Sequence, residues 1–181
     1  HFDTETITAE GSAIYRGGFA KVKTLIDAAK AENPDTLVFD SGDFSMGTLY
    51  QTIFTSRAPE LDLMYQMGYD AAAFGNHEFD YRAEGLAQML TEATDNNTKV
   101  PLVISNIDWD KTLADEALKT DAAALKSAMD SYGVKDYMII NKGGAKIAVF
   151  GIMGYNAIEY APKSGLIFSD PLQSAKNTVE K

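Results

Sequence analysis

Hydrophobic side chains along this chain recur alternately at helical and at strand spacing. In residues 19–30, apolar positions fall every three or four residues and lysines occupy the opposite face, which predicts an amphipathic helix. Residues 36–39 and residues 69–74 are short apolar runs, and both predict buried strands. The same reasoning predicts helices at 59–67 and 82–94, a strand at 100–105, a helical stretch at 111–131, a hairpin of 137–140 with 146–150, and a helix from 171 onward. The strand–helix alternation predicts an α/β fold.

Several element boundaries carry local signals of their own. Pro59 suits the first turn of a helix, and Gly68 suits its end. A Gly143-Gly144 pair between two apolar runs is typical of a hairpin turn. The Asp170-Pro171 pair predicts the start of the last helix.

Length and composition describe one domain with a hydrophobic core. The chain has 181 residues, of which 45% are hydrophobic, so neither a disordered nor a fibrous protein fits. No apolar run approaches the ~18 residues of a membrane span, so we expect no membrane insertion. The lack of cysteine excludes a disulfide scaffold, a thiolate nucleophile and a cysteine-ligated zinc site. The first residue is His1 rather than Met, so we expect a preceding segment in the natural protein.

The charge balance limits the kinds of partner. Acidic residues outnumber basic ones 26 to 16, and the formal net charge is −10. A surface that binds nucleic acid polymers normally shows the opposite balance, so we expect no such partner. An anionic small substrate would also be repelled by the general field of the protein. Metal ions are the obvious source of local positive charge, because few basic residues lie near the motifs described next.

Polar residues follow the first two predicted strands directly. The first strand leads into Gly42-Asp43, and the second leads into Gly75-Asn76-His77. The connection between them has the length of a crossover, which indicates neighbouring parallel strands. Loops at the carboxyl ends of parallel strands share one edge of the sheet, where α/β proteins bind ligands. We therefore expect Asp43 and Asn76 to converge.

These residue types suit a site for divalent metal ions. A carboxylate can bridge two ions, an amide oxygen can bind one, and a neighbouring imidazole can act on a bound phosphate. Each residue also has a simpler explanation: Asp43 alone fits a turn, His77 alone fits a structural role, and Asp80 fits a cap for the next helix. Their grouping at two adjacent strand ends favours the functional interpretation.

Two motifs resemble those of a known family. Residues 41–48 (SGDFSMGT) and 75–80 (GNHEFD) are similar to the second and third motifs of calcineurin-like metallophosphoesterases, especially the bacterial 5′-nucleotidase, UDP-sugar hydrolase and 2′,3′-cyclic phosphodiesterase branch. The GNHE segment within residues 75–80 is highly specific to this family. Further similar segments are 17–20, 105–107 and 146–151.

The resemblance implies a fold and a set of roles. The fold would be part of a four-layer α/β/β/α sandwich, with the C-terminal portion missing. Asp43 would bridge two divalent metal ions of the Mn, Zn or Fe class, and Asn76 would bind the second ion. His77 would stabilise charge on the phosphoryl group, and Asp80 would hold the imidazole of His77 in position.

The sequence also departs from the family pattern. The first family motif, Asp-x-His, is absent, and the later metal-binding histidines are absent because the only histidines are His1 and His77. Residues 108–135 look like a helical insertion into the N-terminal part of the phosphoesterase domain, which would span 1–181. The nucleoside-binding C-terminal domain of the nucleotidase branch is missing as well.

We therefore predict a fragment of an extracytoplasmic, two-metal phosphoester hydrolase of the 5′-nucleotidase type, which converts a nucleotide and water to a nucleoside and phosphate. The 181-residue chain alone should be inactive and should self-associate through uncovered sheet surface. Two alternatives remain. One is hydrolysis of another ester, such as a cyclic nucleotide, a nucleotide sugar or a sulfur ester, on the same fold. The other is a non-catalytic binding domain.

Overall fold

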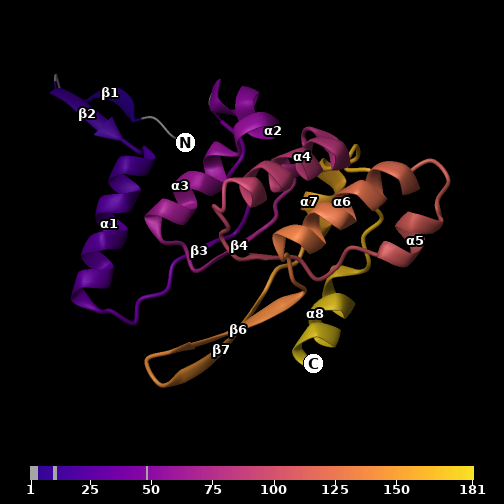
Figure 1. Cartoon of the computed structure of the whole chain (residues 1–181). Helices are drawn as coiled ribbons and strands as arrows, with labels where there is room; N and C mark the ends of the chain where they lie inside the picture. The colour runs from indigo at the N-terminus through magenta and orange to yellow at the C-terminus, as the bar shows by residue number, and fades with distance from the viewer. Residues whose placement is uncertain (1–3, 10–11, 48) are drawn as a thin grey trace.

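The computed structural model describes residues 4–9, 12–47 and 49–181 (Figure 1). Helices and strands alternate through most of this range, as the hydrophobic pattern predicts. The strands are β1 (Glu5–Ala9), β2 (Ser12–Arg16), β3 (Phe39–Asp40), β4 (Ala71–Ala73), β5 (Leu102–Val103), β6 (Tyr137–Lys142) and β7 (Ala145–Phe150). The α-helices are α1 (Phe19–Glu32), α2 (Phe54–Arg57), α3 (Pro59–Met67), α4 (Arg82–Asp95), α5 (Trp109–Ala114), α6 (Lys119–Tyr132), α7 (Tyr155–Tyr160) and α8 (Pro171–Val179). Two short 3₁₀ helices are η1 (Leu49–Ile53) and η2 (His77–Phe79).

A parallel sheet with the strand order β3-β4-β5 lies at the centre. β3 runs parallel to β4, with Phe39 opposite Ala71, and β4 runs parallel to β5, with Ala72 opposite Leu102. The predicted parallel arrangement is thus confirmed, and the carboxyl ends of β3 and β4 lie at one edge. After β7 the chain returns to this sheet, where the Ser105 backbone N–H donates to the Gly151 carbonyl at 2.8 Å.

The strands are shorter than the apolar runs that predict them. β3 begins only at Phe39, because the backbone N–H of Val38 donates to the Asp70 carboxylate at 2.8 Å instead of to a strand. The prediction that residues 36–39 form a buried strand is also wrong for Phe39, whose side chain is 46% exposed. The space beside it is lined mainly by small and apolar residues of β4, β5 and the segment 149–152, with Asp40 and Ser41 at the end of β3.

Helices α3, α4 and α6 supply much of the apolar core that covers one face of the sheet. Leu86, Met89 and Leu90 of α4 and Leu125 of α6 are fully buried in the same cluster as Leu102 of β5. Figure 1 shows α4 and α6 side by side, in agreement with their extensive contacts. The apolar stripe of α1 is less well covered, since only Ile26 is buried in that helix and Leu25 is exposed.

Helix boundaries follow the local signals. Pro59 occupies the first turn of α3, and Gly68 ends that helix in the left-handed conformation, at φ 79°. The Asp170 carboxylate caps α8 by accepting from the Gln173 backbone N–H at 2.7 Å. The stretch at 111–131 is helical but broken between α5 and α6, and whether it is an insertion stays a prediction.

Two antiparallel hairpins flank this body. The predicted hairpin of β6 and β7 is present, and Gly143 and Gly144 at its tip have φ values of 56° and 77°. Figure 1 shows it extending away from the helices. The hairpin of β1 and β2 was not predicted. Across the described ranges, no helix is long and apolar enough to cross a membrane.

Candidate active site

The loops that follow β3 and β4 touch through two glycines. A Cβ atom on Gly42 would lie 2.2 Å from the backbone nitrogen of Gly75. A Cβ atom on Gly75 would lie 2.2 Å from Oδ1 of Asp43. Neither position has room for a side chain, and Gly42 also has a φ of 103°, which disfavours any other residue. The two glycines therefore allow the loops to approach closely at the carboxyl edge of the sheet.

Asp43 lies directly against the second loop. Its Oδ1 accepts a hydrogen bond from the backbone N–H of His77 at 3.0 Å. Asp43 itself has a φ of 61°, a left-handed conformation that aspartate tolerates better than most residues. Asn76 precedes His77 and is half-buried, and its side chain forms no hydrogen bond with any residue of the described ranges. The predicted convergence of the two strand ends is present.

His77 and Asp80 form a hydrogen-bonded pair across the short helix η2. The distance from His77 Nδ1 to Asp80 Oδ2 is 2.9 Å. Gln51 donates to the same Asp80 oxygen at 2.9 Å and so helps to fix the carboxylate. The hydrogen bond that His77 donates to the Asp80 carboxylate raises the pKa of His77. Partial burial lowers this pKa, and the negative charges of Asp80, Asp43 and Glu78 raise it.

Asp80 does not cap the following helix. The N-cap residue of α4 is Tyr81, and no side chain caps that position. With Nδ1 of His77 held by the Asp80 carboxylate, Nδ1 is the protonated nitrogen of a neutral imidazole, and Nε2 is the nitrogen that remains for other partners.

Glu78 has a structural position that the sequence did not reveal. Its side chain is fully buried, and it accepts three backbone hydrogen bonds from the two loops. Burial raises the pKa of Glu78, and the backbone N–H groups of Asp43, Gly75 and Ser45 oppose that rise. An acid between His77 and Phe79 is the only signal in the sequence, and it does not say that the side chain points inward.

Comparison with known proteins identifies the family. Residues 1–151 match the sequence model of the calcineurin-like phosphoesterases. The chain belongs to this family. The Trifunctional nucleotide phosphoesterase protein YfkN of Bacillus subtilis is 30% identical over 89% of the chain and 12% of its own length. The 5′-nucleotidase of Rattus norvegicus is 31% identical over 91% of the chain and 26% of its own length.

Solved structures agree with the fold of this phosphoesterase. The 5′-nucleotidase precursor from Thermus thermophilus superposes with a TM-score of 0.72 over 99% of the chain and 31% of its own length, at 24% identity. That likeness confirms the predicted α/β fold class. The phosphoesterase chain thus spans about a quarter or less of these curated relatives and about a third of this structure.

Calcineurin-like phosphoesterases use divalent metals, and the residues at this edge fit part of such a site. The Asp43 carboxylate and the Asn76 amide are oxygen donors of the kind that divalent cations accept. Asp40 lies nearby, but its Oδ1 accepts from the Gly42 backbone N–H at 2.9 Å, and burial raises its pKa. Among the residues that the structure describes, no group of three or more His, Cys, Asp or Glu could hold a metal ion. The chain's own residues would therefore hold one side of the site.

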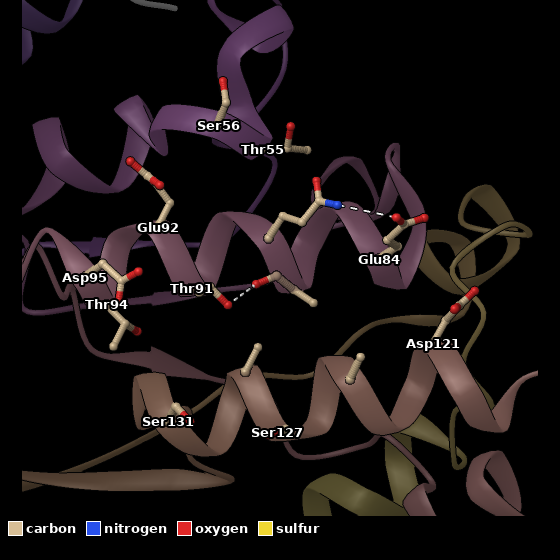
Figure 2. A pocket seen from close by; sticks show the side chains of 14 residues that line it. Thr55, Ser56, Glu84, Thr91, Glu92, Thr94, Asp95, Asp121, Ser127 and Ser131 are labelled. Atoms are coloured by element: carbon tan, nitrogen blue, oxygen red, sulfur yellow. Dashed lines mark hydrogen bonds between the residues drawn. The ribbon is translucent and has the colours of Figure 1, made fainter.

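A large groove of the phosphoesterase chain lies away from this sheet edge. A groove of about 910 Å³ runs between α4 and α6, with Thr55 and Ser56 of α2 at its margin (Figure 2). Its charged lining residues are all acidic: Glu84, Glu92, Asp95 and Asp121. A groove with four carboxylates and no basic side chain does not suit a phosphoester. The chemistry at the sheet edge, rather than the size of the groove, identifies the candidate site.

Proposed function

We propose that the protein containing this chain is a divalent-metal-dependent nucleotide phosphoester hydrolase of the 5′-nucleotidase type. The observation that carries the proposal is the His77–Asp80 pair at 2.9 Å, joined to Asp43 by the hydrogen bond on the His77 backbone. Residues that only form a turn or cap a helix would not need a histidine–carboxylate pair bonded to a second carboxylate from another loop. Membership of the phosphoesterase family and likeness to named 5′-nucleotidases support the substrate class.

The residues of this chain would divide the work as follows. Asp43 and Asn76 would donate oxygen atoms to the metals, which when bound supply the electrophile and an acidified water. His77, protonated on both ring nitrogens, would donate a hydrogen bond from Nε2 to a phosphoryl oxygen as negative charge develops there, and the raised pKa of the imidazole favours that doubly protonated form. Asp80 would hold the imidazole in the orientation and protonation state that this requires.

We also infer that the isolated 181-residue chain is inactive. Asp43 and Asn76 are only two donors, and the formal net charge of −10 repels an anionic substrate when no cation is bound. The remaining ligands and the substrate-binding surface would come from the rest of the protein. The proposed metals are of the Mn, Zn or Fe class.

Two further properties belong to this proposal. We place the protein outside the cytoplasm, as a secreted, periplasmic or cell-wall-associated enzyme. We also propose that the isolated chain self-associates, because Phe39 is exposed on β3, which is an edge strand of the three-stranded sheet.

Phosphate release from a panel of esters tests the function. The full-length protein would be incubated with a nucleoside 5′-monophosphate, a cyclic nucleotide and a nucleotide sugar, each with Mn²⁺ and with a chelator. Metal-dependent release from the monophosphate above the other two supports the proposal, and preference for another ester supports the alternative hydrolase. Nucleotide binding without hydrolysis of any ester would favour a non-catalytic domain.

A further inference from the structure

We propose that Glu78 is a positioning residue for the active site: its buried carboxylate fixes the loops that carry Asp43 and Asn76 relative to each other. The proposal rests on the proposed function, since it assumes that these two residues donate to a metal. It assigns no contact between Glu78 and the metal or the substrate.

One carboxylate ties both loops together. Oε2 of Glu78 accepts from the Gly75 backbone N–H at 2.7 Å and from the Asp43 backbone N–H at 2.9 Å. Oε1 accepts from the Ser45 backbone N–H at 3.1 Å. The bond to Gly75 is local, whereas those to Asp43 and Ser45 connect residues 35 and 33 positions apart. The loop after β3 and the loop after β4 are thus held by the same side chain.

The geometry requires an acceptor at both oxygens. All three partners are N–H donors, and a carboxylate is the side chain that offers only acceptor sites. Glu78 is fully buried, so water does not replace a lost partner, and each amide left unpaired would be costly. An isosteric amide in this place would turn an NH₂ group toward at least one backbone N–H.

The Asp43 backbone depends on this arrangement. Its φ of 61° lies in a region that costs free energy for any residue other than glycine. The bond from the Asp43 N–H to Glu78 offsets that cost and helps to hold the Asp43 carboxylate against the His77 backbone. Without it, Asp43 can relax toward a common conformation, and its carboxylate would move away from Asn76.

Two variants and a matched control separate positioning from simple stabilisation. Glu78→Gln removes an acceptor and the charge, and Glu78→Asp keeps the carboxylate on a shorter side chain. Glu84→Gln is the same chemical change at an exposed acid of α4, where the carboxylate accepts only a 3.4 Å bond from Gln88. All measurements are made on the full-length protein, well below the midpoint of thermal unfolding.

The first readout is deuterium exchange in metal-free protein, in peptides that cover residues 42–46 and 74–78. The second is the affinity for Mn²⁺ alone, measured by calorimetry. We expect Glu78→Gln to speed exchange in both peptides and to weaken Mn²⁺ binding by about 10- to 100-fold, as loss of an orienting partner does at other metal sites. Glu78→Asp should fall between wild type and Glu78→Gln in both readouts, and Glu84→Gln should match wild type.

Unchanged exchange in both Glu78 variants would overturn the claim that the Glu78 carboxylate holds the two loops together. Faster exchange with unchanged Mn²⁺ affinity would overturn the positioning role and leave Glu78 as a purely structural residue. If Glu78→Gln does not fold, Glu78→Asp decides between the same outcomes. Deuterium exchange requires no enzymatic activity, so it tests the role of Glu78 independently of the proposed function. A failure of the proposed function would instead show as absent ester hydrolysis by the wild type.

Discussion

Oδ1 of Asp43 accepts a hydrogen bond from the backbone N–H of His77 at 3.0 Å. The two residues are 34 positions apart and follow different strands of the parallel sheet. This bond places the proposed metal donor beside the proposed catalytic imidazole. It also separates two roles for His77, because the backbone contacts Asp43 while the side chain contacts Asp80.

Replacing His77 by alanine should affect turnover far more than metal binding. The backbone N–H that holds Asp43 remains in His77→Ala, whereas the imidazole that would stabilise the phosphoryl group is lost. We expect kcat to fall by about 10²- to 10⁴-fold, with a much smaller change in Mn²⁺ affinity. Steady-state kinetics and calorimetry on the full-length protein check this. Equal losses in both quantities would make His77 a metal ligand instead.

The close approach of the two loops makes Gly75 intolerant of a side chain. In Gly75→Ala the new methyl group would meet Oδ1 of Asp43 at 2.2 Å and force the loops apart. We expect a loss of about 1–3 kcal/mol in the free energy of unfolding and weaker Mn²⁺ binding. Gly154→Ala is the control, since nothing lies within 4 Å of its Cβ position and its φ is −71°. Equal stability of the two variants in denaturant unfolding would contradict the contact.

The sequence predicts those parts of the structure that depend on local chemistry. Pro59, Gly68 and Asp170 bound their helices as expected, because each acts on backbone groups within one turn. The start of β3 was not predictable, since the N–H of Val38 is taken by the side chain of Asp70, 32 residues away. Exposure of Phe39 was equally hidden, because an apolar run does not reveal whether anything covers it.

The contacts of the candidate site also fall into those that the sequence predicts and those that it does not. Convergence of Asp43 with Asn76-His77 followed from the parallel order of two strands, and the His77–Asp80 contact was implied by the resemblance of residues 75–80 to the family motif. The three amide bonds to Glu78 could not be predicted, because two of them join residues more than 30 positions apart. Such a contact exists only once both loops are in place.

A second buried acid, Glu60 in the first turn of α3, should make stability fall as pH rises. Glu60 is 1% exposed, and neither of its side-chain oxygens has a hydrogen-bond partner in the described part of the chain. Burial, reinforced by the charge of Glu78, raises the pKa of Glu60 from 4.5 to about 7. Between pH 4.5 and about 7, the folded state therefore holds this proton while the unfolded state has lost it. The free energy of unfolding falls as the pH rises through that window.

Glu60→Gln should remove this loss. At pH 8 we expect the variant to be more stable than wild type by on the order of 3 kcal/mol, and at about pH 4, below both pKa values, we expect the two to be alike. Denaturant unfolding at both pH values measures the difference, with the exposed Glu84→Gln as the control. A variant that is destabilised at the higher pH would show that ionised Glu60 has a partner and is needed.

The exposed side chain of Phe39 should drive self-association of the isolated chain. Sedimentation velocity should show species that grow with concentration, and Phe39→Ser should raise the dissociation constant by about tenfold or more. Tyr160→Ser is the control, because Tyr160 is 72% exposed but belongs to helix α7 rather than to a sheet strand. A wild-type chain that stays monomeric at high concentration would refute the association, and equal effects of both variants would place it elsewhere.

Phosphate release from a nucleoside 5′-monophosphate by the full-length protein tests the central claim most directly. Wild type and His77→Ala would be assayed side by side with Mn²⁺, before and after chelation, together with the isolated 181-residue chain. We predict rapid release by the wild type that chelation abolishes, a large loss in His77→Ala, and no release by the isolated chain. Release that survives chelation, or that is as fast in His77→Ala as in wild type, would contradict the proposed function.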